Sequence, residues 1–269
     1  MAKGNGGQRR VGGALGVAAA AIAAAGIAVL VSSRSASLSS VEGAQALPAS
    51  SPSALTVPLP VRLPRSGTVA HWASVRRDVT ARASPSYRAS AVEELATTTP
   101  EGTANLVQVV GRARDREGRL WIHVRLPVLP NSRTGWVPRQ ALGVYGVVHT
   151  HLLIDLERLR ATLRRDGRPI FRAPIGVGRP EWPTPKGEFY IRDMVTRYRS
   201  PFFGPLAFGT SARSSGLTDW PGGGFIGIHG TDEPELLPGR VSHGCIRLRN
   251  QDILELGRLM PVGTPVTIR

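Results

Sequence analysis

The amino-acid sequence predicts a mostly β protein with one clear helix. Between residues 71 and 147, and again from residue 149 to the C-terminus, short apolar runs are separated by turn residues, which is typical of β-strands. Asp166-Gly167 separates two apolar stretches, and this dipeptide favours the tight turn of a β-hairpin. The start and stop signals of a helix coincide with apolar periodicity only near residues 250–260.

Length and composition are those of a folded protein. The chain has 269 residues, of which 41% are hydrophobic and 20% charged, so a wholly disordered chain is excluded. This length allows one large domain or two small ones. Cysteine occurs once, so no intrachain disulfide can form, and the single thiol is either buried and inert or reactive.

The chain is strongly basic. Lys and Arg number 34 against 19 Asp and Glu, a net charge of +15, and Lys3 and Lys186 are the only lysines. The excess of arginine indicates either a solvated basic surface or attraction to a polyanion such as nucleic acid, anionic lipid or an anionic cell-wall polymer. No zinc-finger spacing, Walker loop or aromatic RNA-binding motif is present, so we expect no nucleic-acid partner.

The first residues predict a membrane segment. Residues 11–33 carry no charge and are about long enough to cross a bilayer as a helix. Basic residues precede this run and Arg34 is the first charge after it, so the N-terminus is expected in the cytoplasm and the rest of the chain outside. Three interpretations stay open: an uncleaved single-pass anchor, a signal peptide cleaved after Ala46, and a buried helix of a soluble protein.

Four parts follow from these patterns. Residues 1–33 are the anchor or signal peptide, and residues 34–66, rich in Ser, Ala and Pro, are a tether that cannot fold alone. Residues 67–147 predict a small antiparallel barrel. Residues 148–269 predict a second, larger β domain.

The predicted barrel is similar to a bacterial SH3-like module in three segments, residues 78–82, 121–124 and 134–137. That resemblance implies a module that binds cell-wall peptide or packs against a catalytic partner. Residues 120–126 alternate, with Ile122, Val124 and Leu126 on one face and Trp121, His123 and Arg125 on the other. We expect Trp121 and Trp136 in the barrel core rather than on a ligand platform, and His123 exposed.

The second region opens with an ambiguous pattern. Four leucines at spacings of four, three and four favour a helix over residues 152–163, whereas the Asp166-Gly167 turn that follows favours strands, and we expect strands. Further strands are expected at residues 187–192, 224–229 and 264–268. Asn250 is a good N-cap for a helix over residues 251–260, which Pro261 ends.

His149 and His151 fall on one face of a predicted strand, as in some metal sites. No third ligand is apparent in the sequence, so we expect ordinary strand residues and no metal or other cofactor.

The residues with the clearest chemistry surround Cys245. The thiol follows Ser242, His243 and Gly244, and His229 lies 16 positions upstream. A thiol nucleophile requires an imidazole that raises its thiolate fraction and backbone N–H groups that stabilise an oxyanion. The amides of Gly244 and Cys245, at a tight turn, are the candidate donors.

This arrangement resembles the active-site motif of the YkuD-type L,D-transpeptidases: His229, a gap of about a dozen residues, then Ser-His-Gly-Cys-Ile-Arg over residues 242–247. Residues 183–189 are similar to the segment that leads into a central strand of that family. The likeness covers residues 149–269 and implies a YkuD-like β-sandwich or barrel catalytic domain.

The resemblance also implies a reaction. Such enzymes attack the carbonyl of the diamino acid at the third position of a peptidoglycan tetrapeptide stem, release D-alanine and keep a thioester. An amine of a second stem then gives a 3→3 cross-link, whereas water would give L,D-carboxypeptidase activity. Carbapenems acylate the same thiol in many members. The partners are thus stem peptides outside the cytoplasm, and the oligomeric state is not predicted.

Carried over to this chain, Cys245 is the nucleophile and His229 the general base and acid, with His243 as the rival for that role. The oxygen that orients the base can only be a backbone carbonyl, because Gly230 follows His229. If His229 is the base, His243 shapes the site.

The other expected site residues have weaker roles. Ser242 is expected to hydrogen-bond His243. Arg247 either holds a substrate carboxylate or forms a salt bridge. Trp220, within residues 218–224, either contacts the donor peptide from a flap or belongs to an ordinary loop.

Two other function classes remain. The first is a catalytically silent wall-binding protein, against which the presence of both His229 and Cys245 argues. The second is a Cys-His peptidase or amidase that hydrolyses wall peptide. Papain-like enzymes place their His after the Cys, whereas both histidines here precede it.

Overall fold

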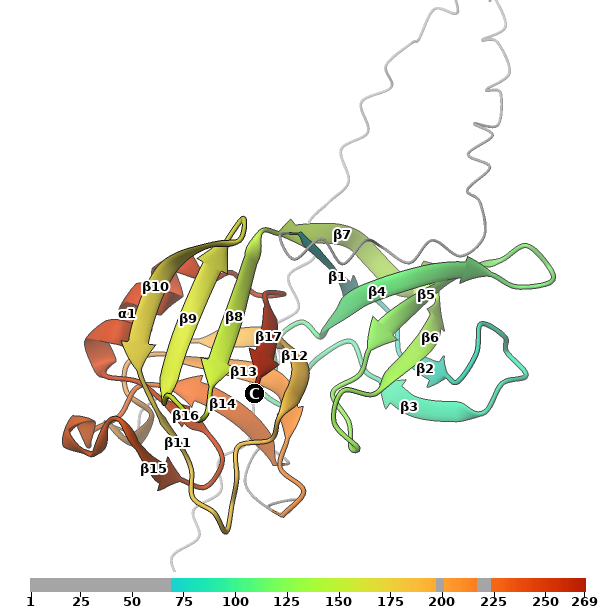
Figure 1. The fold of residues 1–269 in the computed structure, drawn as a ribbon. Coiled ribbons are helices and arrows are strands. Elements are labelled where there is room, and N and C mark those ends of the chain that lie inside the picture. Colours follow the sequence, from blue (N-terminus) through green and yellow to red (C-terminus); the bar gives the residue numbers. More distant parts are fainter. Residues whose placement is uncertain (1–68, 197–200, 217–223) are drawn as a thin grey trace, which may run out of the picture. The chain divides into compact units, whose positions relative to one another are not determined.

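The computed structural model describes residues 69–196, 201–216 and 224–269, which fall within one compact unit of the chain, Leu55–Arg269. These residues form two β-sheets, coloured cyan to green and yellow-green to red in Figure 1. Within these ranges, the prediction of a mostly β protein with one α-helix is confirmed. The expected membrane segment and tether lie outside the described residues. Within the described ranges, no helix is long and apolar enough to span a membrane.

Seven strands form the first sheet, in the order β3-β2-β6-β5-β4-β1-β7, and every pair is antiparallel. The antiparallel arrangement expected for residues 67–147 is confirmed, whereas the resemblance to an SH3-like module and the domain boundaries stay predictions. The strands are β1 (Ala70–Val75), β2 (Val79–Arg82), β3 (Ala91–Leu95), β4 (Leu106–Arg114), β5 (Leu120–Arg125), β6 (Thr134–Pro138) and β7 (Leu142–Val148).

Strand β5 buries one residue on the face that the alternation marks as polar. Ile122 and Val124 are buried as the alternation predicts, but Trp121 on the opposite face is also fully buried. The turn between β4 and β5 explains this, because the carboxylate of Asp115 accepts a hydrogen bond from Trp121 Nε1 at 2.9 Å and one from Arg119 Nε at 2.7 Å. Trp121 is therefore a core residue, as expected.

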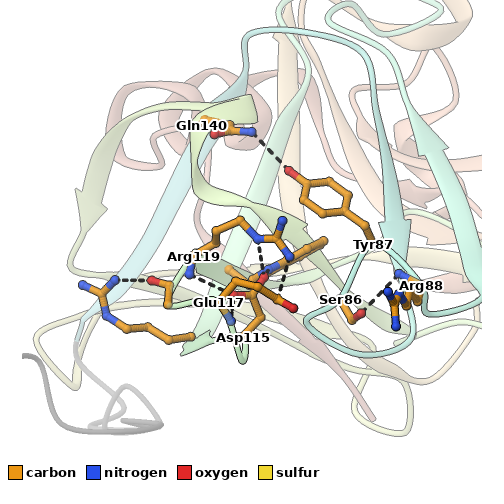
Figure 2. A network of polar contacts seen from close by, with 10 residues as sticks. Ser86, Tyr87, Arg88, Asp115, Glu117, Arg119 and Gln140 are labelled. Atoms are coloured by element: carbon orange, nitrogen blue, oxygen red, sulfur yellow. Dashed lines mark hydrogen bonds and ion pairs between the residues drawn. The ribbon is translucent and has the colours of Figure 1, made fainter.

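The Asp115 carboxylate is held in its charged form by this turn. Figure 2 shows Arg119 joined to both Asp115 and Glu117. Burial alone raises the pKa of Asp115, but the hydrogen bonds from Trp121 and Arg119 outweigh it and lower the pKa to about 2.

His123 was expected to be exposed, and this is wrong. Its ring stacks on Trp136 with centroids 4.4 Å apart and planes within 7°, so both side chains are half-buried. The stack arises because β5 and β6 pair His123 directly with Trp136.

Ten strands form the second sheet, in the order β10-β9-β8-β17-β12-β13-β14-β16-β11-β15. Three of its pairs are parallel, namely β8 with β17, β14 with β16, and β11 with β15. The strands are β8 (Thr150–Asp155), β9 (Arg160–Arg165), β10 (Arg168–Pro174), β11 (Gly176–Gly178), β12 (Gly187–Val195), β13 (Ala207–Arg213), β14 (Phe225–His229), β15 (Gly239–Ser242), β16 (Ile246–Arg247) and β17 (Pro265–Ile268).

Residues 152–163 are strands rather than a helix, as expected. Leu152 on β8 pairs with Leu163 on β9, and both are fully buried, so the leucine spacing reflects a hairpin folded back on itself. The next turn, between β9 and β10, has φ of 50° at Asp166 and 78° at Gly167, which confirms the predicted Asp-Gly hairpin.

Helix α1 spans Asn250–Leu259 and buries Ile253 and Leu256. The expectation that Asn250 caps it is wrong, because the N-cap is Arg249 and Asn250 is the first residue inside the helix. No side-chain hydrogen bond caps α1. The Asn250 side chain is instead used by a different segment, as described below.

The two histidines of the predicted strand at 149–151 have separate partners. His149 Nδ1 lies 2.9 Å from Asp166 Oδ1, and His151 Nε2 lies 2.8 Å from Thr267 Oγ1. The described part of the chain holds no group of three residues that could bind a metal ion.

Hydrogen bonds join the two sheets. The buried Tyr190 on β12 donates its hydroxyl to the carbonyl of Leu106 on β4 at 2.9 Å. Asn131, which follows β5, accepts the backbone N–H of Arg213 at 2.9 Å and donates to its carbonyl at 2.7 Å.

Candidate active site

The parallel pairing of β14 with β16 brings the two sequence motifs together. Their register places His229 opposite Arg247 and Ile228 opposite Ile246, so Cys245 lies immediately before β16 and next to Gly227 of β14. The Gly227 amide donates to Cys245 Sγ at 3.4 Å. A Cβ built on Gly227 would lie 3.7 Å from His229 Cδ2 and 3.8 Å from Cys245 Sγ. The thiol and the imidazole therefore flank the same glycine.

The turn before the thiol is closed by Ser242. Ser242 Oγ donates to the Cys245 carbonyl at 2.6 Å and accepts from the Gly244 amide at 3.1 Å. Gly244 has a φ of 116°, and its carbonyl accepts a hydrogen bond from Thr184 Oγ1 at 2.8 Å. Two expectations are therefore corrected. The hydroxyl of Ser242 bonds to backbone atoms of the turn rather than to His243, and the Gly244 amide, a candidate oxyanion donor, already donates to Ser242.

His229 is held in one tautomer. Its side chain is almost completely buried, and Nδ1 lies 2.6 Å from the carbonyl oxygen of Gly230, the backbone oxygen expected from the sequence. A carbonyl only accepts, so Nδ1 carries the hydrogen and Nε2 carries the lone pair. Burial lowers the pKa of His229 to about 4, although the hydrogen bond to Gly230 acts in the opposite direction. The ring is therefore neutral at pH 7.

The thiol is also neutral at rest. Burial raises the pKa of Cys245, while the Gly227 amide and the positive charge of Arg247 oppose this less strongly. Part of the Cys245 surface still reaches solvent. The resting site therefore holds a thiol beside a neutral imidazole whose Nε2 accepts a proton.

A pocket with an aromatic wall opens over these two groups. It is lined by His229, His243 and Cys245 together with Phe202, Phe203, Ser214, Gly224, Phe225, Ile226, Ser242 and Arg247. The Phe203 ring packs edge-on against His229, with centroids 5.1 Å apart. Phe202 and Phe203 belong to the short helix η2 (Pro201–Phe203), and the sequence analysis did not identify them.

Arg247 is buried beside the pocket and already has an acidic partner. Its Nη1 lies 2.9 Å from Glu233 Oε2, and its guanidinium stands 4.5 Å from the centre of the Phe202 ring. Its Nε has no hydrogen-bond partner within the described ranges. Of the two expected roles, the salt bridge is present, and Glu233, just before the short helix η3 (Pro234–Leu236), was not predicted.

His243 also lines the pocket, whereas the carbonyl of Gly230 is bound by His229. Its ring packs on Trp182 with centroids 4.3 Å apart, and its side chain is half-buried. Trp220 and most of the segment around it, residues 217–223, lie outside the described residues.

Comparisons with known proteins identify the family of this domain. Residues 149–268 match the YkuD family model, the L,D-transpeptidase catalytic domain. YkuD of Bacillus subtilis is 34% identical over 144 residues, which are 52% of this chain and 80% of that protein. YkuD of Bacillus licheniformis is 42% identical over 117 residues, 44% of this chain and 64% of that protein.

Among the solved structures that match this chain is the catalytic domain of the E. faecium L,D-transpeptidase. It is 27% identical, covers 45% of this chain and 96% of that one, and aligns with a TM-score of 0.35. The family-model match and the Bacillus subtilis relative, four-fifths of which this chain covers, together establish that the chain belongs to the YkuD family of L,D-transpeptidases.

Proposed function

We propose that this protein is a peptidoglycan L,D-transpeptidase that acts outside the cytoplasm and carries its donor peptide as a thioester on Cys245. The observation that carries the proposal is the position of the only cysteine beside a buried imidazole whose Nε2 is unprotonated. The stem peptide, the cross-link and the location come from the family resemblance.

In the first step, Cys245 Sγ attacks the carbonyl carbon of the third stem residue. The C–S bond forms while Nε2 of His229 takes the thiol proton. Because the pKa of His229 is low, the resulting imidazolium is a strong acid and readily gives this proton to the departing nitrogen of D-alanine. The C–N bond breaks and the thioester remains. The Cys245 amide is the proposed oxyanion donor.

In the second step, the side-chain amine of an acceptor stem attacks the thioester carbonyl. His229 removes the amine proton, the C–S bond breaks, and the thiolate takes the proton back, which leaves a 3→3 cross-link. The rings of Phe202, Phe203 and Phe225 favour the acceptor amine over water as the second nucleophile, because an apolar pocket holds few water molecules beside the thioester. Hydrolysis to a carboxypeptidase product is the alternative outcome.

The other predicted residues take supporting roles. We assign to Arg247, which is held by Glu233, the role of attracting an anionic stem peptide by its positive charge. We assign to His243 a contact with the donor or the acceptor peptide in the pocket. Trp220 stays a proposed donor contact. The N-terminal parts, as anchor, tether and SH3-like module, would hold the catalytic domain at the wall.

The test uses the full-length chain and a disaccharide-tetrapeptide, with products identified by mass spectrometry. The wild-type protein should release D-alanine and form a 3→3 dimer, and Cys245→Ala should form none. Cys245→Ser, with a melting temperature near that of the wild type, is the conservative comparison. Dimer formation by Cys245→Ala at the wild-type rate would refute the mechanism, and a product of tripeptide alone would favour the carboxypeptidase.

A further inference from the structure

The side chain of Asn250 makes a contact that its own helix does not need. Asn250 is the first residue of α1, yet its side chain caps nothing in that helix. Its Oδ1 instead accepts a hydrogen bond from the backbone N–H of Thr231 at 3.0 Å. Thr231 lies two residues after His229.

The Gly230–Thr231 peptide group links Asn250 to the imidazole. Its N–H donates to Asn250 Oδ1, and its carbonyl, that of Gly230, accepts from His229 Nδ1. A hydrogen bond donated by an amide N–H makes the carbonyl of the same peptide a better acceptor, because the two groups polarise each other. Asn250, one peptide group and His229 thus form one chain of hydrogen bonds that ends at the catalytic ring.

The surroundings fix this arrangement. A Cβ on Gly204 or on Gly230 would collide with Asn250 Oδ1, so both positions accept only glycine while Asn250 keeps its place. Gly204 also has a φ of 64°, in the region that favours glycine. Asn250 itself is exposed at the surface, but its oxygen is packed between two backbones.

We propose that Asn250 is a positioning residue of the reaction: it holds the Gly230–Thr231 peptide so that the carbonyl keeps the hydrogen of His229 on Nδ1 and the lone pair on Nε2. This rests on the proposed role of His229 as base. Without the Asn250 bond, the peptide can turn, the tautomer with hydrogen on Nε2 gains population, and that form cannot take the thiol proton.

The first readout needs no substrate. Nitrogen NMR of the full-length, ¹⁵N-histidine-labelled protein reports the tautomer of each ring, and His229→Gln identifies the signals of His229. The wild type should show hydrogen on Nδ1 alone. Asn250→Ala should show both tautomers, and Asn250→Asp, which keeps an oxygen acceptor, should restore the wild-type pattern.

The second readout is the rate of acylation by a carbapenem, followed by intact-protein mass. Asn250→Ala should lower the maximal rate by about tenfold or more, because part of the molecules hold the wrong tautomer, with little change in the carbapenem concentration that gives half the maximal rate. Asn131→Ala is the matched control, since it also removes an Asn oxygen that accepts a backbone N–H, but the N–H is that of Arg213 and not that of the peptide group bonded to His229.

The outcomes separate the two proposals. A wild-type tautomer pattern in Asn250→Ala, or equal losses of rate in Asn250→Ala and Asn131→Ala, would overturn the role of Asn250. A tautomer change without any cross-linking by the wild-type protein would leave the positioning role supported and refute the transpeptidase assignment. If Asn250→Ala does not fold, hydrogen on Nε2 in the wild-type spectrum would alone reject the inference.

Discussion

The two sheets differ in the direction of their strands, and the candidate active site lies at a parallel pair of the second sheet. In the first sheet all pairs are antiparallel, so the chain leaves neighbouring strands at opposite edges. In the second sheet β14 and β16 run parallel, and both leave at the same edge, after His229 and Arg247. The next residues along each segment, Thr231 and Asn250, can therefore meet. A parallel pair thus assembles a site from two segments that a hairpin would separate.

The largest difference in acylation rate should appear when one histidine of each sheet is replaced by alanine in turn. His229 and His123 both contact aromatic rings, and burial lowers the pKa of both. His229→Ala should lower the rate of carbapenem acylation by about a thousandfold, within the range of general-base catalysis, whereas His123→Ala should leave it nearly unchanged. Intact-protein mass against time measures both. A small effect of His229→Ala would transfer the base role to His243.

Sequence reasoning succeeded where partners are near in the chain. The Asp166-Gly167 turn and the apolar stripe of α1 are local signals, and the motif around Cys245 is contiguous. The assignment of Asn250 as a helix cap failed because its real partner, Thr231, lies 19 positions away.

Long-range contacts also explain the other misses. Glu233 reaches Arg247 only because η3 follows β14, and Phe203 meets His229 only after η2 and β14 are brought together by the sheet. Nothing in a single sequence encodes such neighbours directly.

A second comparison concerns how the stability of the folded protein depends on pH through His229. The pKa of His229 is about 4 in the folded protein and roughly 6.5 in the unfolded chain. Between these values the unfolded chain binds a proton that the folded protein does not, so stability falls as the pH drops from 6.5 to 4. The loss should be on the order of 3 kcal/mol.

Guanidinium unfolding at pH 7, 5.5 and 4.5 measures this loss. His229→Gln should show a flatter pH dependence than the wild type, and His123→Gln should change it less. The same slope in His229→Gln and in the wild type would mean that His229 is not buried as a neutral ring.

The smallest expected effect is a difference in the free energy of unfolding between variants of two Arg–Glu pairs. Arg247 is buried and faces Glu233, while Arg119 and Glu117 form an exposed pair in the first sheet (Figure 2). Glu233→Gln leaves a buried guanidinium without its counter-charge and should cost about 2 kcal/mol. Glu117→Gln should leave the stability nearly unchanged, because both partners of this pair are exposed. Equal losses in denaturant unfolding would contradict the burial of Arg247.

The raised pKa of Cys245 has a consequence for the protein in an oxidising environment. Peroxide attacks the thiolate rather than the thiol, so a sulfur that stays protonated is converted only slowly to sulfenic acid. Since no second cysteine exists to form a disulfide with that acid, a lesion at this position would not be repaired within the chain. Under the proposed mechanism, a sulfur that stays protonated until the donor carbonyl binds would therefore lengthen the working life of each molecule.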